Sequence, residues 1–187
     1  MALQIAQDDH ADRVLNDDPF ALLVGMLLDQ QFPMERAFAG PAKILDRFGT
    51  LEPGAVAAAD PDAFADLCAT PPAIHRYGRS MAARVQALAR VVADEYDGDA
   101  SSIWTGARTG RALVDRLRAL PGFGDQKATI FAALLAKQLG VKPRGWTLVT
   151  GDYGRVGYRS VADVVDAESL AKVRAHKQKV KQAARES

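Results

Sequence analysis

A five-residue turn between two helical segments is the feature that most constrains the fold of this chain. Apolar residues recur at helical spacing before the turn, in residues 110–119, and after it, in residues 125–139. The turn, Leu120–Gly124, contains Gly122 and Gly124, and glycine adopts positive φ without a Cβ clash. It therefore predicts a sharp reversal whose amides, with the start of the second helix, can bind an anion. On these residues alone, an ordinary connection between two helices is an equal alternative.

The rest of the sequence also predicts helices, with almost no strand. Asp18-Pro19 and Asp60-Pro61 each combine an N-cap residue with a proline at the first helical position. A stripe of apolar residues from about 80 to 96 predicts one long helix. We therefore expect an all-α protein, with further helices over 33–48 and 168–184, one long irregular segment over 140–157 and a capping box at Ser160–Asp163.

Composition excludes several kinds of site. With 48% hydrophobic and 25% charged residues, the 187-residue chain is typical of a globular protein. The single Cys68 excludes an internal disulfide and a four-cysteine iron–sulfur cluster, and the three histidines lack the spacing of a zinc site. No basic leader and no membrane-length apolar run is present. We therefore expect no membrane partner and a cytoplasmic protein, nucleoid-associated if bacterial.

The net charge of +1 conceals a division of the chain into two halves of opposite charge. Residues 1–100 contain 16 acidic and 8 basic side chains, a balance of −8, whereas residues 101–187 contain 7 acidic and 16 basic ones, a balance of +9. The basic half includes the glycine turn. This asymmetry predicts a polyanionic partner, although the basic residues from Lys172 to Arg185, taken singly, also fit a solvated helix face.

Three segments, in this order, resemble the HhH-GPD family of base-excision-repair DNA glycosylases. The stretch from Asp18 to Gln31 is similar to the family's first core helix, which ends in a glutamine. Arg76–Ala82 is similar to its loop into a long helix, and Leu120–Gly124 is similar to its hairpin almost letter for letter. The resemblance covers most of the chain and implies an atypical, short member without an iron–sulfur cluster.

The resemblance also implies a two-lobed helical architecture with DNA in the groove between the lobes. We expect residues 1–187 to form a single unit. Its central lobe would cover about 55–139 and carry the hairpin at 120–124, while the second lobe would gather 1–54 and 140–187. 

In the family, the hairpin amides bind DNA phosphates, and its carbonyls commonly hold a monovalent cation. The resemblance therefore implies that double-stranded, damaged DNA is the partner, that Gly122, Phe123 and Gly124 contact it, and that Gln31 enters the duplex beside a flipped base. A solvated glutamine at a helix end is the alternative for Gln31. Apart from that cation, the resemblance implies no cofactor.

Family members that also cleave the DNA strand carry a lysine two positions beyond the second hairpin glycine. Here that position is Gln126, and the lysine that follows, Lys127, is rotated by about 100° around a helix. We therefore expect a monofunctional glycosylase without lyase activity. Both residues are predicted to contact DNA, with a plain surface charge as the alternative for Lys127.

Asp152 is the predicted catalytic carboxylate. It is the only acid between Asp125 and Asp163, and it follows the Gly/Pro-rich segment as the family pattern requires, although later than in known members. An anion there would stabilise an oxocarbenium-like transition state and orient water. Asp152 is also a common kind of turn residue, so a binder of damaged or distorted DNA without catalysis remains the alternative function. A helical scaffold unrelated to DNA leaves the hairpin and the charge division unexplained.

Overall fold

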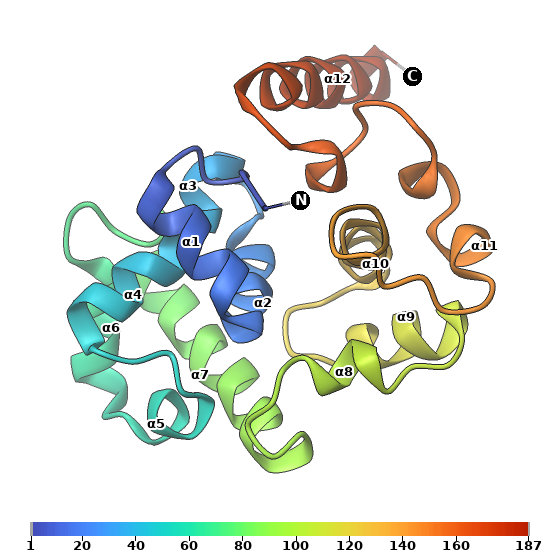
Figure 1. Cartoon of the computed structure of the whole chain (residues 1–187). Helices are drawn as coiled ribbons and strands as arrows, with labels where there is room; N and C mark the ends of the chain where they lie inside the picture. Colours follow the sequence, from blue (N-terminus) through green and yellow to red (C-terminus); the bar gives the residue numbers. More distant parts are fainter. Residues whose placement is uncertain (1, 187) are drawn as a thin grey trace.

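The computed structural model describes residues 2–186, and within this part of the chain it contains helices and no β-strand, which confirms the all-α prediction (Figure 1). Helix α2 (Pro19–Leu28) is at the centre of the N-terminal half. The Asp18 carboxylate caps it by accepting from the amide of Phe20 at 2.8 Å, and Pro19 begins it as expected. Every residue from Phe20 to Leu28 is buried, and neighbouring helices of the same half pack against α2.

The packing contacts between helices fall into two groups, which form the two sides of the molecule in Figure 1. The first, here called the N-terminal lobe, contains α1 (Asp9–Asp17), α2, α3 (Met34–Phe38), α4 (Gly40–Phe48), α5 (Pro53–Ala58), α6 (Pro61–Ala69) and α7 (Gly78–Glu95). The second, the C-terminal lobe, contains α8 (Ser102–Thr105), α9 (Gly110–Arg118), α10 (Asp125–Gln138), α11 (Trp146–Thr150), the 3₁₀ helices η1 (Gly151–Gly154) and η2 (Val161–Asp163), and α12 (Ala167–Glu186).

Each lobe is continuous in sequence, whereas the expected division placed both chain ends in one lobe. The difference arises because α7 packs on α5, α6 and α2, while α10 packs on α9, α11 and η2. The change of charge near residue 100 falls in the connection between α7 and α8. The C-terminal lobe is therefore the basic half of the chain.

Two segments differ locally from the sequence-based prediction. The helix expected over 33–48 is divided into α3 and α4 at Ala39, because Pro41 has no amide proton to continue the hydrogen-bond ladder. The segment expected to be irregular, 140–157, contains the short helices α11 and η1. The capping box at Ser160–Asp163 and the last helix are confirmed.

One continuous hydrophobic core joins the two lobes. It includes Leu27 and Leu28 at the end of α2, and Phe123 and Phe131 in the C-terminal lobe. Among the described residues, no helix combines the length and the apolar character that spanning a membrane requires.

Candidate nucleic-acid interface

The hairpin, Leu120–Gly124, joins α9 to α10 with its apolar residues turned inward and its glycines outward. Leu120 and Phe123 are buried, and the Phe123 ring packs edge-on against Phe131 with 6.0 Å between ring centroids. Gly122 has a φ of 80°, in the left-handed region that favours glycine, and both it and Gly124 are exposed. The core thus fixes the turn and leaves its backbone accessible.

The N-terminus of α10 opens at the same place. Gly124 is its N-cap residue, and within the described chain no side chain caps this helix. Amides of the first helical turn lack intrahelical acceptors, so they can donate to an anion. Asp125, in that first turn, forms an ion pair with Arg118 at 2.7 Å, and its side chain is 83% exposed. The pair is therefore open to competition from an external phosphate.

Substitutions at the two hairpin glycines are expected to affect different properties: the stability of the fold at Gly122 and DNA binding at Gly124. A Cβ on Gly122 would overlap the buried Leu27 side chain, whereas one on Gly124, with a φ of −84°, would meet open space. We expect Gly122→Ala to lower the free energy of unfolding by about 1–3 kcal/mol and Gly124→Ala to change it by less than about 0.5 kcal/mol. Gly124→Ala should instead weaken duplex DNA binding about 10-fold, because its methyl group blocks a phosphate hydrogen bond.

Urea unfolding and fluorescence anisotropy with a duplex measure the two effects. Equal stability of both variants would contradict the packing of Gly122 on Leu27. Wild-type DNA affinity in Gly124→Ala would contradict phosphate binding at the hairpin.

Helices α10 and α12 meet the end of α2 and the start of α3 along an interlobe seam, defined by Leu27, Asp29, Glu35, Lys127, Arg174 and Lys177. The Lys127 ammonium donates to the carbonyl of Leu27 at 2.8 Å. Lys177 lies 3.8 Å from the carboxylate of Asp29, whose side chain is only 9% exposed, and Arg174 forms an ion pair with Glu35. Polar contacts thus hold the lobes together at the place where the hairpin faces outward.

Burial controls the pKa values of Asp29 and Lys127 in the seam. It raises the pKa of the Asp29 carboxyl even though Lys177 and Lys127 favour the charged form. It also lowers the pKa of Lys127 from 10.5 to about 8, despite the attraction of Asp29. Both charges are therefore costly to keep in this place, and neither Lys127 nor Asp29 behaves as a plain surface charge.

The pKa of Lys127 predicts how stability depends on pH. Between pH 8 and 10.5 the unfolded chain retains a proton on Lys127 that the folded chain has lost, so the free energy of unfolding should rise with pH. Relative to Lys127→Met, the wild-type curve should rise by up to about 1.4 kcal/mol per pH unit in this interval. Urea denaturation of both proteins across the interval measures the difference, and parallel curves would contradict the assignment.

Gln31 lies exposed in the loop after α2. Its φ of 51° is left-handed, an uncommon and strained conformation for a residue other than glycine. Arg76 donates to its side-chain oxygen at 3.3 Å and to the Tyr77 hydroxyl at 2.7 Å, and stacks over the Tyr77 ring. Gln31 is therefore held at the surface four residues beyond Leu27, which contacts the hairpin. Its insertion into DNA stays a prediction.

A cavity of about 260 Å³ opens beside the first turns of α10 and is here called the α10–α12 cavity. Gln126 lines it and donates to the Tyr153 hydroxyl at 3.0 Å, which joins η1 to α10. One face of α12 forms the opposite wall. The full lining consists of Gln126, Ile130, Tyr153, Arg159, His176, Lys177, Val180, Lys181 and Ala184.

Asp152 is not among the residues that line this cavity. It lies in η1, its side chain is 64% exposed, and it forms an ion pair with Arg155 at 2.9 Å. Its neighbour Tyr153 points to Gln126 instead. The structure thus brings Gln126 and Tyr153 together and leaves the predicted carboxylate outside, one residue away.

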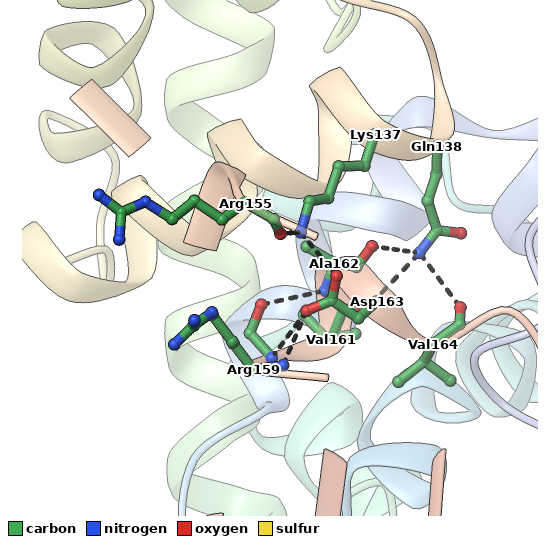
Figure 2. A network of polar contacts seen from close by, with 9 residues as sticks. Lys137, Gln138, Arg155, Arg159, Val161, Ala162, Asp163 and Val164 are labelled. Atoms are coloured by element: carbon green, nitrogen blue, oxygen red, sulfur yellow. Dashed lines mark hydrogen bonds and ion pairs between the residues drawn. The ribbon is translucent and has the colours of Figure 1, made fainter. Parts of the chain in front are cut away.

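Asp163, the next acid in the sequence, has a structural role. Its side chain is 6% exposed, lies 2.6 Å from the Lys137 ammonium and accepts from the amide of Arg159 at 2.8 Å (Figure 2). Gln138, beside Lys137 on α10, donates to three carbonyls of the same segment, those of Val161, Ala162 and Val164 (Figure 2). This network holds the segment that carries Tyr153 and Arg159 against α10.

The sequence analysis missed Asp29, Arg159 and His176 as site residues. Asp29 had a signal, since it is an acid that directly follows the apolar run of α2. Arg159 and His176 had none, because only the packing of η2 and α12 on the rest of the C-terminal lobe brings them to Gln126.

Comparison with known proteins gives one match. The chain matches the family model described as HhH-GPD superfamily base excision DNA repair protein over residues 24–187. Searches of curated proteins and of solved structures found no match. The matched range contains Gln31, the hairpin, the seam and the α10–α12 cavity.

Proposed function

This chain belongs to the HhH-GPD superfamily of base excision DNA repair proteins, and on that premise we propose that it is a monofunctional DNA glycosylase. It would bind damaged duplex DNA, turn one nucleotide out of the helix and hydrolyse its N-glycosidic bond without cutting the strand. One observation carries the proposal, the α10–α12 cavity beside the hairpin, with Gln126 in its wall. A phosphate held at the hairpin would present the neighbouring nucleotide to this cavity.

Binding of the DNA backbone is proposed for the hairpin and the basic C-terminal lobe. The balance of +9 in residues 101–187 attracts phosphates regardless of sequence, which suits a protein that searches DNA. The carbonyls of Leu120 and Gly124 accept from the amides of Phe123 and Ala128, and each keeps a second lone pair that fits the monovalent cation implied by the family. Work on chromosomal DNA would place the protein in the cytoplasm, on the nucleoid in a bacterium.

One residue identity and one contact support the absence of strand cleavage. Gln126 has an amide, which is no nucleophile, at the position of the lyase lysine. Lys127 donates to the Leu27 carbonyl in the seam, so its amine is directed away from the α10–α12 cavity. To contact a DNA phosphate directly, Lys127 would have to give up its hydrogen bond to the Leu27 carbonyl.

The carboxylate in the proposed reaction is Asp152. Both side chains of its ion pair with Arg155 are exposed, and such pairs contribute only about 0–1 kcal/mol to stability. A DNA phosphate can therefore bind Arg155 in place of Asp152 and leave the carboxylate unpaired. The same exposure favours a second function, recognition of damaged DNA without base removal.

Base release separates the two functions. The wild-type protein is incubated with duplexes that each contain one deaminated, oxidised or alkylated base, and the free bases are measured by mass spectrometry. We expect one class of lesion to be released, together with salt-sensitive binding to duplex DNA. Binding without release from any duplex would leave recognition alone as the function, and no salt-sensitive binding would contradict both.

A further inference from the structure

The α10–α12 cavity is rich in hydrogen-bond donors and in positive charge. Gln126 donates to the Tyr153 hydroxyl, which leaves the hydroxyl proton free to donate in turn. The other polar groups in the lining are Arg159, His176, Lys177 and Lys181, and no acidic residue is among the lining residues. At about 260 Å³ the cavity is slightly smaller than the roughly 300–1,000 Å³ of sites for drug-sized ligands, which suits a single nucleobase.

One donor among the residues that line the cavity, the Nε of Arg159, lacks a hydrogen-bond acceptor within the described chain. The backbone amide of Arg159 is held by Asp163 at 2.8 Å, which fixes its position. The Nε itself is buried. An unpaired buried N–H is unfavourable, so an acceptor brought by a ligand would remove that cost.

Charge decides which bases such a cavity accepts. Lys177 is partly balanced by Asp29, 3.8 Å away, whereas within the described residues no carboxylate forms an ion pair with Arg159 or Lys181. A purine nucleotide alkylated at N7 or N3 is cationic and would be repelled here. A base with ring carbonyls offers acceptors to Arg159, Gln126 and Tyr153, and it departs with a negative charge that the same cations stabilise.

We propose that the substrate of this protein is a neutral base with ring carbonyls that leaves as an anion, a deaminated or oxidised base of the uracil type, and that cationic alkylated purines are excluded. The proposal rests on the glycosylase function proposed above. In the reaction, the C1′–N bond breaks and its electron pair leaves on the base nitrogen. A water oxygen bonds to C1′, one water proton passes to the carboxylate and on to solvent, and the base anion takes a proton from solvent.

Binding to uncleavable duplexes tests the substrate class apart from catalysis. A 2′-fluorine blocks hydrolysis, so one duplex carries 2′-fluorodeoxyuridine opposite guanine and the other carries 2′-fluoro-7-methyldeoxyguanosine opposite cytosine. We expect wild-type protein to bind the uracil duplex about 10-fold more tightly, the order of one charge-assisted hydrogen bond. Arg159→Gln and Lys181→Gln should each reduce this preference, whereas Arg13→Gln, an exposed change on α1, should not.

The outcomes distinguish the substrate class from the proposed function. Equal affinity for the two duplexes, or a preference for the alkylated one, overturns the substrate class. Release of alkylated purines with uracil-type bases left intact also overturns it and leaves the glycosylase function standing. Tighter binding to the uracil duplex without release of any base overturns the glycosylase function and retains the preference of the cavity.

Discussion

Asp163→Ala is expected to lower the free energy of unfolding by about 3–5 kcal/mol, because it leaves a buried lysine without its counter-charge. Lys137 and Asp163 are only 16% and 6% exposed, and their separation is 2.6 Å. The substitution also removes the acceptor for the amides of Arg159 and Ser160. Urea denaturation measures the loss.

Asp66→Ala is the matched control, since Asp66 also pairs with an arginine, Arg79, but is 70% exposed. Asp66→Ala should lower the free energy of unfolding by less than about 1 kcal/mol. Equal losses in the two variants would show that the network in Figure 2 contributes no more than a surface pair.

Asp152→Asn is expected to slow base release by about 100-fold while duplex binding stays within about 2-fold, because the variant keeps the shape of the side chain and loses the anion. Single-turnover release from the preferred duplex and anisotropy with the same duplex measure the two quantities. Asp125→Asn is the control, an exposed acid paired with Arg118 in the first turn of α10. Its removal takes away one repulsion of phosphate and should leave release intact.

Unchanged release in Asp152→Asn would contradict the role of Asp152. The next variant is then Asp29→Asn, because Asp29 is the buried acid beside Lys177, which lines the α10–α12 cavity. If Asp29→Asn loses base release and Asp152→Asn does not, the catalytic carboxylate is that of Asp29 in the seam.

Local signals in the sequence were sufficient for the helices that matter to the site. Asp18-Pro19 predicted the start of α2, the glycine turn predicted the reversal between α9 and α10, and Ser160–Asp163 predicted the cap of η2. Each of these depends on hydrogen bonds within a few residues. The family resemblance added the order of the segments, and the match of the family model over residues 24–187 confirms the family.

Long-range packing could not be predicted in the same way. The hydrogen bond of Lys127 joins residues 100 positions apart, and the cavity brings Gln126 to His176 and Lys177 on α12. Such contacts depend on how the lobes meet, which periodicity does not encode. The residue roles at the site, including those of Gln31 and Asp152, therefore stay predictions that need solution measurements.

The central claim is that the α10–α12 cavity receives the sugar and base of a nucleotide turned out of the DNA. Gln126→Lys tests it most directly, because an amine there would condense with the C1′ aldehyde of an abasic site, lose water and form an imine that borohydride reduces to a stable amine link. We predict that Gln126→Lys is trapped on abasic duplex DNA and that the wild type, with Lys127 committed to Leu27, is not. Absence of trapping in Gln126→Lys, with abasic DNA bound as tightly as by the wild type, would contradict the claim.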